Sequence, residues 1–431
     1  MEYISIIILV VIFVSLMVLG VPVAWSLGLS GFVTLLVTVA TVPAATTIAQ
    51  RMGTGLDSFS LLAIPFFVLA GEIMNKGGIA NRLIDLAKAL TGRLPGGLLY
   101  VNVIASMLFG AIAGSAVAAA SAIGGILGPR MENEGYPREL GAAVNITAST
   151  TGLIIPPSNI LIVYSLASGG VSIGALFIAG YIPGLLIGLL LMGVAAVFIK
   201  KHKLPLGDVT SWKELAIKMV RAFPSLLLLV IVIGGIVIGA FTATEASAIA
   251  VIYTLALSFF YKELKVKEVP SILLKASETT AIVLLLIATS MSMSWVMSSE
   301  DIPQSISSAL LTLSDNKFVV LIIINLILLF VGLFMDMTPA VLIFTPIFLP
   351  VVVSLGIDPI HFGIIMVTNL CIGVCTPPVG SVLFIGVGVA KTTIAKVFLP
   401  ILPFFLAMIF GLIMITIWPQ LSLWLPSLFG L

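Results

Sequence analysis

Gly152-Leu-Ile-Ile-Pro-Pro157 interrupts an otherwise apolar segment that runs from residue 139 to residue 168. The same pattern returns 221 positions later as Gly373-Val-Cys-Thr-Pro-Pro378, inside the apolar segment 359–390. Three further pairs recur at an offset of 222, namely Pro137 with Pro359, Gly141 with Gly363, and Gly110 with Gly332. Because glycine and proline fix the shape of the backbone, this recurrence indicates two copies of one architecture.

The composition is that of an integral membrane protein. Of the 431 residues, 60% are apolar and 9% are charged, and the mean hydropathy is +1.28. Soluble domains carry roughly 25% charged residues, so this chain has too little polar surface to cover a water-soluble globule. At about 20 apolar residues per spanning helix, its length allows roughly 10 to 14 membrane segments. This composition excludes nucleic-acid binding, a secreted disulfide scaffold and a soluble enzyme.

The lysines and arginines predict the topology. The loop at 200–221 is rich in basic residues, and the positive-inside rule places it in the cytoplasm. Counting candidate helices outward from this loop leaves only Arg51 and Lys317, of 20 basic residues, on the outer side. Both termini are then expected outside, in the periplasm of a Gram-negative cell. The stretch 137–157 starts inside and the stretch 359–378 starts outside, so the two copies are inverted. Inverted repeats with broken helices are typical of secondary transporters.

Each copy begins with two short apolar arms, 97–113 with 116–129 and 318–334 with 339–356. In the first copy the arms of about 17 and 14 residues reach roughly 25 and 21 Å. These lengths are short of a hydrocarbon core of ~30 Å, so they predict a re-entrant helical hairpin, although two full spans fit the basic residues equally well. The tips of the two hairpins are then Gly114-Ser115-Ala116 and Met335-Asp336-Met337-Thr338-Pro339.

The two tips are expected to meet the two proline breaks and to form a cation site. A proline in a helix frees the carbonyl one turn earlier, and freed carbonyls with hydroxyls give sodium several neutral oxygens. An acid near the bilayer midplane costs on the order of 3 kcal/mol. Asp336 is therefore expected to couple to a cation or a proton, or else to cap its helix. Ser115 and Thr338 are candidate hydroxyl ligands, with helix capping as the alternative.

Polar residues after the breaks are candidate substrate contacts. Ser158 and Asn159 follow the first break and Ser381 follows the second, where a half-helix N-terminus attracts an anion. Helix capping stays open as the alternative for all three. Glu72 and Glu245 lie in or near other predicted spans, where contacts between helices or subunits are favoured over ion binding.

The chain resembles the large membrane (M) subunit of TRAP transporters, the tripartite ATP-independent periplasmic carboxylate uptake systems of the ion-transporter superfamily. Four motifs carry this resemblance: Pro65-Phe-Phe-Val-Leu-Ala-Gly-Glu72, Phe109-Gly-Ala-Ile-Ala-Gly-Ser115, Gly152-Leu-Ile-Ile-Pro-Pro-Ser-Asn159 and Gly373-Val-Cys-Thr-Pro-Pro-Val-Gly380. The fold class expected is an all-α polytopic membrane protein with two inverted repeats. Each repeat holds a re-entrant helical hairpin and a proline-broken transmembrane helix, and the resemblance adds elevator-type transport and scaffold domains.

The resemblance also implies the function. It implies sodium-driven uptake of an organic carboxylate, either sialic acid or a C4-dicarboxylate, across the bacterial inner membrane, and no enzyme activity. A separate small four-helix membrane subunit and a soluble periplasmic binding protein are the implied partners, besides membrane lipid. No cofactor is expected other than Na⁺ as coupling ion. The resemblance implies that substrate selectivity resides largely in the binding protein. Because the hairpin and break regions hold no arginine to clamp a carboxylate, recognition in the membrane is expected to rest on hydroxyls, amides and helix N-termini.

Two sodium sites follow from the resemblance. The first site maps to Ser115, Gly152, Ile154 and Pro157. The second site maps to Gly332, Asp336, Thr338, Gly373, Cys375 and Pro378.

The predicted domains alternate between scaffold and transport regions. The scaffold helices of repeat 1 cover 1–94, and the transport domain takes hairpin 1 with its broken helix at 95–170 and hairpin 2 with its broken helix at 317–392. The other regions are connecting and scaffold helices with the loop 200–221 at 171–278, a helix and outer arm at 279–316, and the last scaffold helix with the outer C-terminus at 393–431. Amphipathic stretches near 77–92, 263–277 and 302–314 are expected along the membrane surface.

Other functions stay open from the sequence. A stand-alone sodium- or proton-coupled carboxylate carrier shares the inverted-repeat pattern but needs no partner proteins. A passive channel would conduct its solute without a sodium gradient. A membrane enzyme is disfavoured, because no nucleophile–base pair or metal cluster is expected at one membrane depth.

Overall fold

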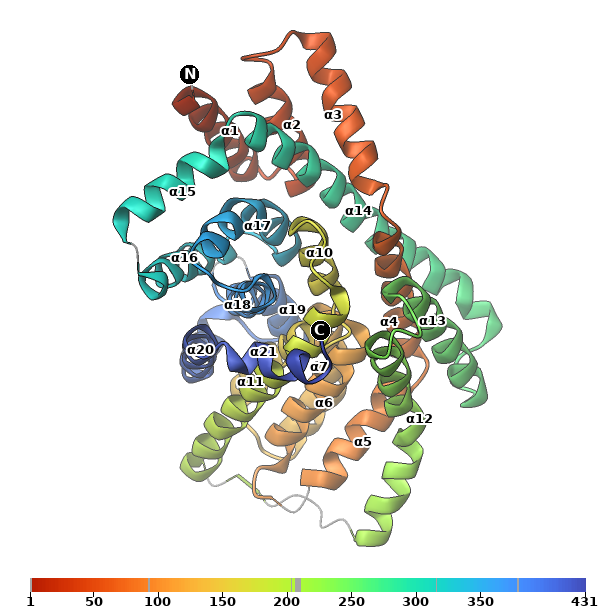
Figure 1. The fold of residues 1–431 in the computed structure, drawn as a ribbon. Helices are drawn as coiled ribbons and strands as arrows, with labels where there is room; N and C mark the ends of the chain where they lie inside the picture. The colour runs from red at the N-terminus through yellow and green to blue at the C-terminus, as the bar shows by residue number, and fades with distance from the viewer. Residues whose placement is uncertain (1, 92–93, 203, 206–210, 315, 378–379) are drawn as a thin grey trace.

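The computed structural model describes residues 2–91, 94–202, 204–205, 211–314, 316–377 and 380–431, and this part of the chain contains helices and connections but no strand. The predicted sodium ligand Pro378 lies outside the described residues. Figure 1 shows the helices as an outer band that curves around a central group.

The outer band comes from two separate parts of the chain. Its first part comprises α1 (Glu2–Val18), α2 (Val23–Leu35), α3 (Thr41–Leu56), η1 (Phe59–Leu62), α4 (Ala63–Lys76) and α5 (Ile79–Thr91). Its second part comprises α12 (Trp212–Val237), α13 (Ala243–Phe260), η2 (Val266–Glu268), α14 (Val269–Ser299) and α15 (Ile302–Leu313). The long α14 packs against α2, α3 and α4, so it ties the N-terminal helices to the rest of the band (Figure 1).

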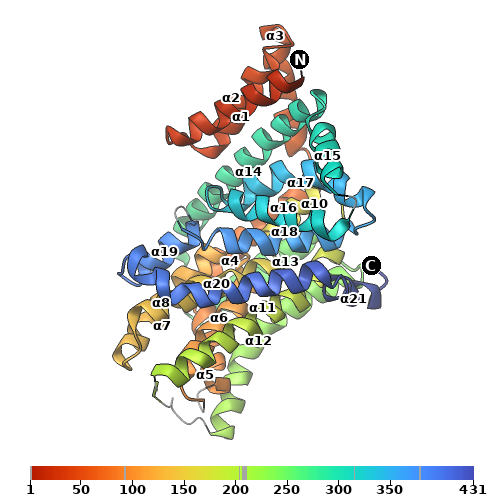
Figure 2. The same cartoon turned by 90° about the vertical axis from the view of Figure 1, so that its left-hand side faces the viewer.

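The central group contains both predicted hairpins and both breaks. From the first half come α6 (Gly97–Ala113), α7 (Ala116–Asn133), α8 (Arg138–Ser149), α9 (Thr151–Ile154) and α10 (Asn159–Ala167). From the second half come α16 (Lys317–Gly332), α17 (Met337–Ser354), α18 (Pro359–Gly373) and α19 (Ser381–Val389). The helices α11 (Ile173–His202), α20 (Ile394–Ile417) and α21 (Gln420–Leu428) lie against this group. Figure 2 shows α7 and α19 on one side of the molecule, with α15 and the C-terminus on the opposite side.

Many of these helices suit a membrane. Within the described residues, seven helical segments are long and apolar enough to cross one, or eight when the bent pair Arg138–Ile154 and Asn159–Ala167 counts as a single span. Five shorter apolar helices of 10–17 residues add to these. The chain is therefore an all-helical multi-pass membrane protein, as its composition predicts.

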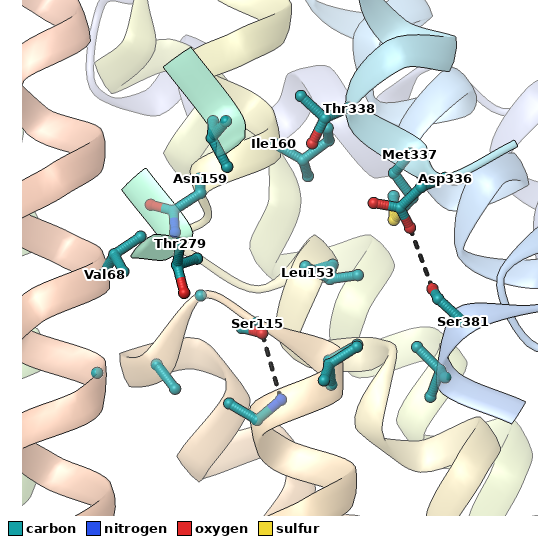
Figure 3. Close-up of a pocket in the computed structure, with 18 of the residues that line it drawn as sticks. Val68, Ser115, Leu153, Asn159, Ile160, Thr279, Asp336, Met337, Thr338 and Ser381 are labelled. Atoms are coloured by element: carbon teal, nitrogen blue, oxygen red, sulfur yellow. Dashed lines mark hydrogen bonds between the residues drawn. The ribbon is translucent and has the colours of Figure 1, made fainter. Parts of the chain in front are cut away.

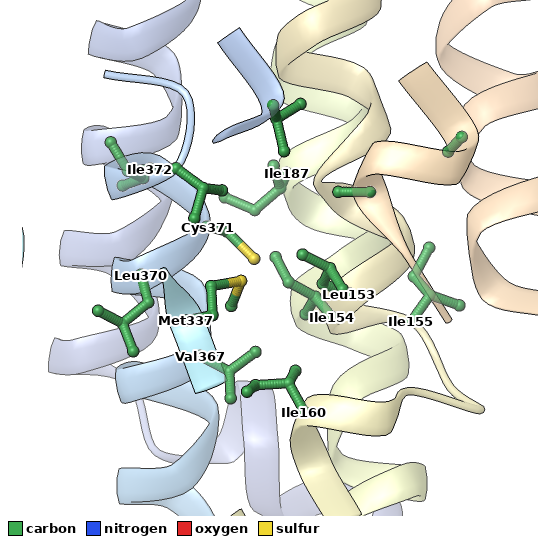
Figure 4. Packing of buried hydrophobic residues seen from close by; sticks show 14 of the residues in the cluster. Leu153, Ile154, Ile155, Ile160, Ile187, Met337, Val367, Leu370, Cys371 and Ile372 are labelled. Atoms are coloured by element: carbon green, nitrogen blue, oxygen red, sulfur yellow. The ribbon is translucent and has the colours of Figure 1, made fainter. Parts of the chain in front are cut away.

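The two halves of the central group pack directly on each other. Figure 4 shows Leu153 and Ile154 of the first break facing Cys371 of α18. The Cys371 thiol donates to the carbonyl of Thr150 at 3.5 Å, and the Cys375 thiol donates to the carbonyl of Ile146 at 3.4 Å. Both thiols are buried, so these contacts hold the broken helices of the two halves together.

Several predicted boundaries need correction. The stretch 263–277 is not a separate surface helix, because most of it begins the continuous helix α14. Helix α3 was not predicted, since its threonines, glycines and alanines leave few buried residues and no apolar run. The arm predicted at 116–129 continues through Pro129 to Asn133. Helices α7 and α17 each have 18 residues and reach about 27 Å, so the re-entrant hairpins stay a prediction.

Candidate functional site

A cavity of about 440 Å³ lies where the hairpin tips and the proline breaks meet. One wall is formed by residues of the central group, including Ser115, Asn159, Asp336, Thr338 and Ser381 (Figure 3). The outer wall is formed by α4 and α14 of the outer band, and it includes Glu72, Asn75, Lys275 and Thr279. Five of the residues predicted for sodium or substrate therefore share one cavity, although they come from four separate stretches of the chain.

The first tip is a tight turn built by Gly114 and Ser115. Gly114 has φ +59°, and a Cβ there would also lie 3.3 Å from the carbonyl oxygen of Pro157. Only glycine adopts this left-handed conformation readily. Ser115 is the N-cap of α7, and its hydroxyl accepts a hydrogen bond from the amide of Ala118 at 3.2 Å. Ser115 therefore caps its helix, which was the predicted alternative to a ligand role. The second lone pair of its oxygen stays available to a cation.

The second tip leaves its carboxylate available to the cavity. Asp336 occupies the N-cap position of α17 but makes no side-chain capping bond within the described chain. One reason is that Pro339, at the third helical position, has no amide proton to donate. The Asp336 Oδ1 instead accepts a hydrogen bond from the Ser381 hydroxyl at 3.0 Å (Figure 3). Ser381 therefore orients the carboxylate, in addition to lining the cavity.

The polar atoms of Asn159 and Thr338 extend this oxygen-rich wall (Figure 3). Asn159 Oδ1 is buried without a hydrogen-bond partner among the described residues. Buried polar atoms nearly always have a partner. Asn159 Oδ1 is therefore an acceptor that a bound cation, water or ligand donor would satisfy.

The remaining predicted ligands lie behind the cavity wall. A Cβ on Gly152 would lie 2.2 Å from the Cα of Gly110, and a Cβ on Gly373 would lie 2.6 Å from the Cα of Gly332. Each hairpin is therefore fixed to its own break by a contact between backbones. Other predicted ligands that are buried and do not line the cavity are Ile154, Pro157 and Cys375.

Ser158 does not line the cavity either. It is buried, and its hydroxyl donates to the carbonyl of Leu153 at 2.6 Å. The side chain thus satisfies a carbonyl that the proline break has freed. The role that the structure supports for Ser158 is to stabilise the break.

An ion pair in the outer wall adds two residues, Lys275 and Glu72, that the sequence did not predict for the site. Lys275 Nζ lies 3.1 Å from Glu72 Oε2, linking α14 to α4. The predicted interhelix contact of Glu72 is thereby confirmed. Glu245 behaves differently, because it forms a reciprocal capping box with Thr242 at the start of its own helix. The available signal in the sequence was Lys275 itself, a basic residue at the edge of the apolar run that begins near Thr279.

Comparisons with known proteins agree with the fold and the motifs. Residues 10–421 match the family described as the DctM component of tripartite ATP-independent periplasmic transporters. The chain is 54% identical to the protein YgiK of Salmonella typhimurium, over 100% of this chain and 99% of that one. It is 41% identical to the C4-dicarboxylate TRAP transporter large permease protein of Pseudomonas aeruginosa, over 94% and 95%. It is 37% identical to the sialic acid TRAP transporter large permease protein of Vibrio cholerae, over 96% and 97%.

A solved structure with much lower sequence identity also supports the fold. The YdaH transporter of Alcanivorax borkumensis superposes with a TM-score of 0.68 at 14% identity, covering 96% of this chain and 98% of that one. The family match over nearly the whole length, together with the full-length relatives, establishes the assignment that the motifs suggest. The chain belongs to the DctM family and is the large membrane subunit of a TRAP transporter.

Proposed function

We propose that this chain performs sodium-coupled uptake of an organic carboxylate, as the transporting subunit of a tripartite system. The observation that carries the proposal is the uncapped carboxylate of Asp336, which shares one cavity with Ser115, Asn159, Thr338 and Ser381. A carboxylate surrounded by neutral oxygens suits a hard monovalent cation. A cation bound at Asp336 also removes the negative charge that would repel an anionic substrate, which provides a physical basis for coupling.

Two sodium sites are part of this proposal. The first uses Ser115 with the backbone of Gly152, Ile154 and Pro157, and the second uses Asp336 and Thr338 with the backbone of Gly332, Gly373 and Cys375. The cysteine contributes its backbone because its thiol already donates to Ile146. Among the substrate candidates, Asn159 is supported by its buried, unpartnered oxygen.

The two halves act as inverted repeats in this proposal. The support is that Gly110 meets Gly152 as Gly332 meets Gly373, so equivalent positions of the two copies make equivalent contacts. The regions 95–170 and 317–392 form an elevator-type transport domain, and the outer band is part of the scaffold against which this domain moves.

The remaining parts of the system follow from the family. The chain lies in the bacterial inner membrane with both termini in the periplasm, as the basic residues predict. A small four-helix subunit binds it within the membrane, and a soluble periplasmic protein delivers the substrate. The substrate class is supported by relatives named for C4-dicarboxylate and for sialic acid, since both compounds carry a carboxylate.

The tripartite mechanism is tested by omitting components. Proteoliposomes holding the chain with its small subunit are supplied with labelled succinate or sialic acid, with or without the binding protein. Sodium-dependent uptake only with all components supports the proposal. Sodium-dependent uptake by the chain alone supports the stand-alone carrier instead.

Replacing Ser381 with alanine is expected to raise the sodium concentration for half-maximal uptake by about tenfold. The substitution removes the hydrogen bond that orients Asp336, and a hydrogen bond to a charged group contributes about 1.5–3 kcal/mol. Threonine keeps the hydroxyl, so Ser381→Thr serves as the control and is expected to behave like the wild type. A normal sodium dependence in Ser381→Ala contradicts the orienting role.

A further inference from the structure

The outer wall of the cavity presents one basic side chain. Lys275 of α14 is the single lysine or arginine among the described residues that line the cavity. Its Nζ has a close polar contact with Glu72 Oε2 of α4 at 3.1 Å. The cavity thus holds a cation on the outer wall, whereas Asp336, Asn159 and Ser381 line it from the central group.

The two members of this ion pair differ in their access to solvent. The Lys275 side chain is 57% exposed, whereas the Glu72 side chain is 15% exposed. A lysine ammonium has three donors, and the structure gives Lys275 Nζ only Glu72 as a partner among the described residues. The ammonium therefore has donors left for an anion in the cavity, while the neighbouring Glu72 carboxylate offsets its positive charge.

We propose that Lys275 binds the anionic group of the substrate and that Glu72 competes with the substrate for the same ammonium. This inference rests on the proposed function, since it assigns the anion-binding residue of that transporter. A lysine ammonium is a point charge that accepts anions of various shapes, unlike the planar fork of arginine. Such a residue suits a membrane site that recognises a class of organic acids and leaves the choice among them to a binding protein.

The placement of Lys275 also links the anion to the two proposed domains. Lys275 and Glu72 belong to the outer band, whereas Asp336 and Ser381 belong to the central group. The 440 Å³ of the cavity lies within the range of roughly 300–1,000 Å³ that small-molecule sites occupy. An organic acid held by Lys275 on one side and by the hairpin wall on the other bridges scaffold and transport domain.

Anion binding to the purified chain with its small subunit tests the assignment. The thermal midpoint is titrated with succinate or sialic acid in sodium buffer, and the apparent Kd is taken from the concentration dependence. Lys275→Met is expected to weaken binding by at least about tenfold, which equals about 1.4 kcal/mol. Glu72→Gln is expected to tighten binding, because it removes the internal competitor. Lys76→Met is the matched control, since Lys76 lies on α4 but does not line the cavity.

The opposite signs separate anion binding from a purely structural ion pair. If the pair only joins α4 to α14, Lys275→Met and Glu72→Gln change the Kd in the same direction, and the assignment is wrong. An unchanged Kd in Lys275→Met, or no saturable response of the wild type to either acid, also overturns it. The neutral diamide of succinate should produce no shift. Failure of the proposed function is seen separately, as the absence of sodium-dependent uptake by the wild-type chain with its partners.

Discussion

Replacing Asp336 with asparagine is expected to abolish sodium-driven uptake, with an initial rate lowered by at least about 100-fold. Even residues that only orient a metal ligand change affinity or activity by about 10–100-fold, and Asp336 is proposed to bind the cation itself. Asparagine keeps the size of the side chain and an oxygen that can accept from Ser381, but it removes the negative charge. The loss should therefore be specific to transport and leave the folded protein intact.

The initial rate of uptake is measured for a variant that is inserted and thermally stable. Asp358→Asn is the matched control, because Asp358 is the N-cap of α18 and its Oδ1 accepts from the amide of Ile360 at 2.7 Å. Asparagine caps helices as well as aspartate does, so this control should transport normally. Equal rates in the two variants are incompatible with a cation site at Asp336.

Replacing Gly152 with alanine is expected to destabilise the central group and to eliminate uptake. The new methyl would lie 2.2 Å from the Cα of Gly110 and 2.6 Å from its carbonyl carbon. Overpacking a tight interior typically destabilises by about 1–3 kcal/mol and sometimes by more, and the upper end applies here because both contacting groups are backbone. Gly373→Ala should act in the same direction, since its methyl would lie 2.6 Å from the Cα of Gly332.

The thermal midpoint of the purified protein measures this effect. Gly125→Ala and Gly128→Ala are the controls, because a Cβ at either position of α7 has no neighbour within 4 Å. Alanine in a helix interior is favoured over glycine by about 0.5–1 kcal/mol, so these controls should be as stable as the wild type or slightly more stable. A midpoint for Gly152→Ala equal to that of the controls contradicts the close contact between hairpin and break.

The positions of glycine and proline made much of the central group predictable. The predicted arm 97–113 coincides with α6, and the break after Gly152 is present as a bend of 50° in the helix. These features depend on local backbone preferences, which the sequence carries directly. Five predicted residues also share the cavity, namely Ser115, Asn159, Asp336, Thr338 and Ser381. The reason is that the recurring glycines and prolines place turns at corresponding positions of the two halves.

Features that depend on contacts between distant helices were not predictable. The position of Lys275 in an apolar helix is explained by Glu72, which lies on a helix some 200 residues earlier in the chain. From the sequence alone, the charge of Lys275 favours a membrane helix that begins after it, near residue 279, whereas α14 begins at Val269. The position of Ser158 after a break predicts a substrate contact, but its hydroxyl donates a hydrogen bond to the freed carbonyl of Leu153 instead. Helix α3 lacks an apolar run, so its amphipathic packing on α14 left no clear signal.

The most direct test of sodium coupling is the accumulation of substrate in sealed proteoliposomes that contain the chain and its small subunit, with the binding protein outside. Labelled succinate or sialic acid is followed under an inward sodium gradient, and the same vesicles are followed with potassium in place of sodium. Sodium-coupled transport predicts that the internal concentration rises above the external one only under the sodium gradient, and that it falls back when the gradient is dissipated. Equilibration to the external concentration, at the same rate with either ion, would contradict sodium-coupled transport and indicate a passive channel.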